Sequence, residues 1–133
     1  MLGIGVGIVA LFVLQAHGFD DEVLELAKMV RESCAGETNV DLSLVEKINA
    51  GAELTPDPVL KCYIKCTLET AGMMSDGVMD LEMVMTLLPD NLKNKHGAAL
   101  ETCGTQKGAD DCDTAYLTQL CWQKACKGDF FLI

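Results

Sequence analysis

The segment Leu60-Lys61-Cys62-Tyr63-Ile64-Lys65-Cys66 carries two cysteines four residues apart. Residues at this spacing lie on one face of an α-helix, so both cysteines can tie this helix to two different partner segments. Cys112 and Cys121 are nine residues apart, about two and a half helical turns, which puts them on opposite sides of a helix. The spacing therefore predicts a helical domain that is cross-linked at several points.

Apolar periodicity along the rest of the chain also favours helices. Several stretches repeat apolar residues every three to four positions, and none alternates apolar and polar residues over a useful length. The fold class is therefore predicted to be all-α. Capping residues, glycines and prolines set the expected limits. The six predicted helices run from Asp20–Glu22 to Gly36, from a Ser43/Glu46 capping box to Gly51, from Thr55-Pro56 to Gly72, from after Asp76-Gly77 to Pro89, from Asp90 to Cys103, and from Asp110 to Gly128.

The N-terminal region has the pattern of a secretory signal. Residues 2–14 are an uncharged apolar run, and small residues follow up to Gly18. The alternative, a membrane anchor, is disfavoured because this run is too short to span a hydrocarbon core of roughly 30 Å. We therefore expect a signal peptide at residues 1–18 and one secreted, extracellular domain at residues 19–133, in a compartment where disulfides form.

Composition excludes some classes of partner. The chain of 133 residues has 10 Lys+Arg against 20 Asp+Glu, so its formal net charge is −10. So acidic a protein is not expected to bind nucleic acid or to insert stably into an anionic membrane. Half of the residues are hydrophobic, which is enough for one packed core.

The seven cysteines are the most informative residues. Six of them allow many disulfide pairings, and the spacing alone does not choose among these pairings. A metal site made by Cys62, Cys66 and His96 is the alternative use of the thiols. It is disfavoured because only one histidine remains after signal cleavage and zinc sites prefer closely paired ligands. No metal and no cofactor are expected.

The pattern Cys34-x27-Cys62-x3-Cys66-x36-Cys103-x8-Cys112-x8-Cys121 resembles that of the six-cysteine insect odorant-binding proteins. Leu88-Pro89, Cys121-Trp122 and the terminal Phe130-Phe131-Leu132-Ile133 are similar to the pheromone-binding members with short C-terminal tails. The resemblance implies the bridges Cys34–Cys66, Cys62–Cys112 and Cys103–Cys121, an interlocked set in a compact six-helix domain around an internal apolar cavity. Cys126 departs from the pattern, either as a buried free thiol or as the bridge of a homodimer.

A carrier of this kind needs an apolar cavity of roughly 300–1,000 Å³. Gly97, Ala98 and Ala99 are small where similar proteins often carry bulkier groups, so the resemblance implies a pocket that is widened there. For each wall residue the alternative is ordinary core packing. By the resemblance the wall comprises Val23, Leu26, Ala27, Val30, Leu81, Val84, Met85, Leu88, Ala99, Leu100, Trp122, Phe131 and Leu132.

The C-terminal residues are expected to close this cavity. By the resemblance, residues 130–133 fold across it as a lid, and the terminal carboxylate of Ile133 is held by Arg31 and Tyr63. The alternatives are a solvated surface arginine and a tyrosine packed beside a disulfide.

The functional expectation is a secreted carrier of small hydrophobic volatile ligands, odorants or pheromones, through aqueous lymph to an olfactory receptor. The first alternative is the same kind of carrier in a non-sensory secretion. The second is a disulfide-linked signalling or structural protein with a solid core. An enzyme is not expected, because no serine lies in a nucleophile elbow and the mature chain has no His-Asp pair with a calcium loop.

Overall fold

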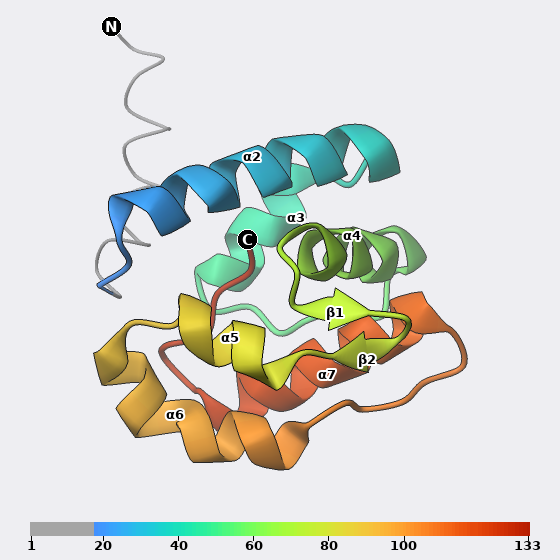
Figure 1. Ribbon diagram of the computed structural model, residues 1–133. Coiled ribbons are helices and arrows are strands. Elements are labelled where there is room, and N and C mark those ends of the chain that lie inside the picture. The colour runs from blue at the N-terminus through green and yellow to red at the C-terminus, as the bar shows by residue number, and fades with distance from the viewer. Residues whose placement is uncertain (1–17) are drawn as a thin grey trace, which may run out of the picture.

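The computed structural model describes residues 18–133 (Figure 1). The predicted signal peptide lies outside these residues except for Gly18. The described part confirms the all-α prediction, with one small hairpin added. None of its helices is both long enough and apolar enough to cross a membrane. Its helices are α2 (Asp21–Thr38), α3 (Leu42–Asn49), α4 (Pro58–Thr70), α5 (Leu81–Leu87), α6 (Asp90–Cys103) and α7 (Asp111–Ala125).

Helix α4 lies at the centre of the fold. It packs against α7 on one side and α2 on another, and α6 packs against α7 (Figure 1). Leu60, Ile64 and Leu68 repeat at intervals of four, and together with Tyr63 they are almost completely buried. Their burial contributes to the apolar stabilisation of the core, since this scales with the area removed from water.

Three disulfides connect these helices in series. Cys34–Cys66 joins α2 to α4, Cys62–Cys112 joins α4 to α7, and Cys103–Cys121 joins α6 to α7. These are the pairs that the resemblance implies. Cys62 and Cys66 leave the same face of α4 toward two different helices, as their spacing predicts. Because both sulfurs are bridged, neither is available as a metal ligand with His96.

The predicted end of α2 and the expected cap of α6 are displaced by one to three residues. Helix α2 continues past Gly36 and stops at Asn39, whose φ of 59° turns the chain out of the helix. Asparagine tolerates this left-handed conformation, so it replaces glycine as the stop signal. Helix α6 has the predicted range, but Asp90, expected as its cap, is its first residue and Pro89 is the N-cap, a position that the fixed φ of proline suits.

Aspartates, rather than the predicted residues, cap α3 and α4. The carboxylate of Asp41 accepts hydrogen bonds from the Ser43 backbone N–H at 2.9 Å and from the Ser43 hydroxyl at 2.7 Å. Asp57 accepts from the Leu60 N–H at 2.9 Å, and Pro58 takes the first helical position. Asp-Pro at this point makes a stronger start signal than Thr55-Pro56, because its carboxylate also satisfies a free N–H of the first turn.

A two-residue hairpin between α4 and α5 was not predicted. Strands β1 (Met74–Ser75) and β2 (Val78–Met79) pair antiparallel across the turn at Asp76-Gly77. Both turn residues have positive φ, the pattern of a tight type I′ connection. Gly77 has a φ of 76°, a left-handed conformation in which other side chains are strained, so glycine is favoured there. Strands of two residues are too short to show an alternation of apolar and polar residues.

Candidate functional site

An apolar pocket of about 130 Å³ lies among α2, α4, α5, α6, α7 and residues 129–133, which we call the C-terminal segment. It is smaller than the cavity expected from the sequence. Phe19 and Phe131 both border it, and their rings meet edge to face with centroids 4.9 Å apart. Predicted wall residues that border the pocket are Val23, Leu26, Ala27, Val84, Leu88, Leu100, Trp122, Phe131 and Leu132.

Four predicted wall residues, Val30, Leu81, Met85 and Ala99, do not border the pocket. Val30 is only 1% exposed and packs in the solid core. The Met85 sulfur lies 3.7 Å from where a Cβ on Gly97 would be, so this side chain occupies the space that the small residues of α6 leave. The predicted widening at Gly97 is therefore wrong. One apolar stripe serves both the pocket and the helix interfaces, and periodicity does not separate these uses.

Helix α4 contributes wall residues that were not predicted. Thr67, Leu68 and Ala71 line the pocket, one to two turns beyond Ile64 on the same helical stripe. Their i, i+3, i+4, i+7 spacing was a usable signal. The other lining residues that were not predicted are Phe19, Leu24, Met73, Leu87, Leu92, His96, Gln119, Cys126, Asp129, Phe130 and Ile133.

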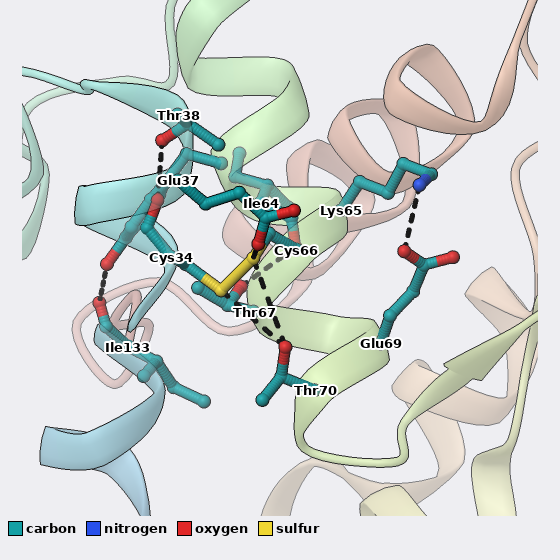
Figure 2. The surroundings of a disulfide bond; sticks show 11 residues. Cys34, Glu37, Thr38, Ile64, Lys65, Cys66, Thr67, Glu69, Thr70 and Ile133 are labelled. Carbon is teal, nitrogen blue, oxygen red and sulfur yellow. Dashed lines mark hydrogen bonds and ion pairs between the residues drawn. A yellow bond between two sulfur atoms is a disulfide. The ribbon is translucent and has the colours of Figure 1, made fainter. Parts of the chain in front are cut away.

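The end of the C-terminal segment is held by side chains of α3 and α4. Asn49 donates from Nδ2 to the Leu132 carbonyl at 3.0 Å and accepts at Oδ1 from the Leu132 N–H at 2.6 Å. The Tyr63 hydroxyl donates to the Ile133 main-chain oxygen at 2.8 Å. Burial raises the pKa of Tyr63 to about 12, so the phenol stays protonated and able to donate. Figure 2 shows Ile133 in the surroundings of the Cys34–Cys66 bridge.

Only the tyrosine half of the expected lock is present. Among the described residues, Arg31 forms its ion pair with Glu46, at 3.4 Å, and not with Ile133. The predicted contact between Arg31 and the chain end is therefore wrong. Glu46 lies on α3, next to α2, and it offers Arg31 a charged partner nearer the surface, where less desolvation is needed. Asn49, which the sequence analysis did not select, takes the place of Arg31 at the segment.

The base of the C-terminal segment is held by charge. Asp129 Oδ2 lies 2.7 Å from His96 Nε2 and 2.9 Å from Lys95 Nζ, both on α6. The His96 and Lys95 hydrogen bonds lower the pKa of Asp129 from 3.8 to about 2. The carboxylate is therefore ionised throughout the physiological range, at the border of an otherwise apolar pocket.

Asp129→Asn is expected to lower the free energy of unfolding by about 1 kcal/mol or less, as for other partly exposed ion pairs. The pKa of Asp129 is lower in the folded protein than in the unfolded one, so the ion pair stabilises the wild type fully above about pH 4. This stabilisation, and with it the difference between wild type and variant, disappears as the pH falls through about 2. Urea unfolding between neutral pH and pH 2 measures it. Asp76→Asn, in the exposed hairpin turn, is the control. A loss that persists undiminished at pH 2 contradicts the prediction.

Cys126 is a free, buried thiol at the point where the chain leaves α7. Burial, and then the negative charge of Asp129, raise the pKa of this thiol. A protonated thiol is a poor nucleophile and a poor metal ligand. The structure therefore agrees with the interpretation of Cys126 as a buried free thiol.

Comparison with known proteins is consistent with this architecture. Residues 16–125 match the PBP/GOBP family. General odorant-binding protein 56a of Drosophila melanogaster is 36% identical over 119 residues, covering 86% of each chain. General odorant-binding protein 69a of the same species is 31% identical over 101 residues, covering 75% of this chain and 68% of that one.

A solved structure is similar as well. The fatty acid binding protein OBP56a from the oral disk of the blowfly Phormia regina has a TM-score of 0.65 at 30% identity, covering 80% of this chain and 94% of that one. The family match spans most of the chain, and the blowfly protein shares its fold. The chain therefore belongs to the PBP/GOBP family of odorant-binding proteins.

Proposed function

We propose that this protein is a secreted carrier that takes a small hydrophobic molecule into its apolar pocket and releases it without breaking a bond. The observation that carries the proposal is the pocket itself, an apolar space of about 130 Å³ in a helical shell fixed by three disulfides. Apolar surface inside a rigid shell gains from burying a ligand without the cost of ordering the protein.

The wall residues that we propose to contact the ligand come from α2, α4, α5, α6, α7 and the C-terminal segment. Ala27 and Val23 lie on α2, Val84 on α5, Leu100 on α6 and Trp122 on α7. Nearly all of these side chains are hydrocarbon, so they favour an apolar molecule over a charged one. The C-terminal segment forms the remaining wall, and its movement is the route that we propose for entry and release.

Delivery of a volatile odorant or pheromone to an olfactory receptor is the role that we propose for this carrier. The blowfly relative, named as a fatty acid binding protein of the oral disk, supports a second role in a secretion outside the antenna. The tissue in which the protein is expressed separates the two. A disulfide-linked homodimer is the less favoured assembly, because the Cys126 thiol is buried.

Filling part of the pocket is expected to weaken ligand uptake. Ala27 lines the pocket near its α2 wall, and Ala27→Leu adds apolar carbons to the space that the ligand needs. We expect this variant to lower the affinity for small alcohols, esters and aldehydes by about tenfold or more. The emission of Trp122, the only tryptophan of the chain, reports binding from inside the wall.

Ala98→Leu is the matched control, because Ala98 is an exposed alanine within α6 and does not border the pocket. Its affinities are expected to equal those of the wild type. Saturable binding that Ala27→Leu weakens and Ala98→Leu does not would support a carrier. Absence of binding to the oxidised wild-type protein would contradict this function, and equal binding by both variants would place the ligand elsewhere.

A further inference from the structure

Two residues of the pocket wall each carry a buried polar atom that has no hydrogen-bond partner within residues 18–133. These atoms are Gln119 Oε1, an acceptor, and Trp122 Nε1, a donor. The two residues are three apart on α7 and therefore share a face of this helix. Both line the pocket, and their exposed fractions are only 6% and 8%. Such groups cost free energy when they stay unpaired, so they mark a place where a bound molecule can satisfy them.

The other polar groups of the wall are already engaged. The Thr67 hydroxyl donates to the Ile64 carbonyl at 2.8 Å, and His96 pairs with Asp129 at 2.7 Å. Gln119 and Trp122 thus differ from their polar neighbours, since their buried oxygen and N–H are left for a ligand. The acceptor and the donor come from residues one helical turn apart in a hydrocarbon wall, so a group that both donates and accepts can satisfy both.

We propose that Gln119 and Trp122 form a subsite for the hydroxyl group of a neutral aliphatic alcohol. The ligand hydroxyl donates its proton to Gln119 Oε1 and accepts the N–H of Trp122, as its one donor and two lone pairs allow. The hydrocarbon chain then lies against Leu68, Val84 and Leu100. This inference rests on the proposed carrier function and names the ligand class for the same pocket.

Other oxygen-bearing ligands fit this pair less well. An ether or ester oxygen accepts from Trp122 but has no proton for Gln119. An ionised carboxylate also only accepts, and it would enter a pocket bordered by the ionised Asp129 in a chain of net charge −10. Two negative groups in a poorly hydrated space repel each other strongly. The hydroxyl is the group that meets both demands without a charge.

The test uses three uncharged ligands with equal numbers of non-hydrogen atoms: hexan-1-ol, methyl pentyl ether and heptane. Hexanoate at neutral pH is the charged comparison. With ¹⁵N-labelled wild-type protein, the single indole N–H signal reports on Trp122 directly. We expect hexan-1-ol and the ether to move this signal downfield, as an N–H does on gaining an acceptor, and heptane to leave it nearly in place.

Two variants separate the two hydrogen bonds. Gln119→Met keeps the side-chain length and is expected to weaken hexan-1-ol binding about five- to tenfold while changing ether affinity less than about twofold. Trp122→Phe is expected to weaken both ligands. Lys124→Met, on the exposed face of α7, is the control and should change neither. If a variant folds poorly, the shift of the indole N–H signal in the wild-type protein still tests the hydrogen bond to Trp122.

The possible results separate the two proposals. Selective loss of hexan-1-ol binding in Gln119→Met, with the indole shift, supports the subsite. Equal losses for alcohol and ether, an unmoved indole signal with bound hexan-1-ol, or tighter binding of hexanoate overturns the subsite and leaves the carrier function standing. If none of the uncharged ligands binds the wild type, the carrier function itself fails and the subsite fails with it.

Discussion

Replacing Cys62 and Cys112 together with alanine is expected to lower the free energy of unfolding by about 4 kcal/mol. This bridge joins α4 to α7, the two helices at the centre of the fold, and spans 50 residues of sequence. Without it the unfolded chain gains the conformational freedom of that loop. Cys103–Cys121 spans only 18 residues, so its removal is expected to cost about 3 kcal/mol.

Urea unfolding of each double variant measures these losses. Cys126→Ala is the matched control, since it removes a buried sulfur that forms no bridge. We expect about 1 kcal/mol for that change, from lost packing alone. A smaller loss for the Cys62–Cys112 pair than for the Cys103–Cys121 pair would show that native packing, rather than chain entropy, dominates the contribution of the bridges.

Asn49→Leu is expected to lower the free energy of unfolding by about 2–3 kcal/mol and to release the C-terminal segment. Leucine has nearly the shape of asparagine, but it makes neither of the two hydrogen bonds to the Leu132 main chain. Leu132 is buried, so its N–H and carbonyl would be left unsatisfied unless the segment moves into water. Faster hydrogen exchange of the Leu132 amide, together with urea unfolding, measures the effect.

Asn94→Leu is the control for this substitution, because Asn94 is exposed on α6 and is expected to change stability by less than about 0.5 kcal/mol. Asn49→Asp adds a second comparison. The aspartate still accepts the Leu132 N–H but cannot donate to its carbonyl, so an intermediate loss is expected. Unchanged amide exchange in Asn49→Leu would mean that Tyr63 alone holds the segment.

The fold was predictable from local signals. The spacing of Cys62 and Cys66 predicted a helix tied to two different segments, and the resemblance supplied which cysteines pair. The caps and prolines located the helices to within a few residues. The errors also have local causes. At Asn39 a left-handed residue other than glycine ended the helix, and at Asp57-Pro58 a better cap lay two residues beyond the predicted one. The hairpin was missed because each strand has only two residues.

The site was less predictable because its contacts are distant in sequence. Asn49 and Leu132 are 83 residues apart, and nothing around Asn49 distinguishes it from a polar residue at a helix end. Arg31 had a nearer partner in Glu46, which a motif match does not weigh. Val30 and Val84 have similar positions in apolar stripes, yet one packs in the core and the other borders the pocket. That difference arises from helix packing, which periodicity does not encode.

The hydrogen bonds that hold the C-terminal segment allow its side chains to change, and with them the ligand preference of the pocket. Asn49 and Tyr63 bind this segment through the main-chain atoms of Leu132 and Ile133, so these bonds do not depend on which side chains the segment carries. Phe130, Phe131 and Ile133 can therefore be exchanged while the attachment is kept, and each exchange reshapes the wall. A library randomised at these three positions would sample new ligand preferences on an unchanged scaffold.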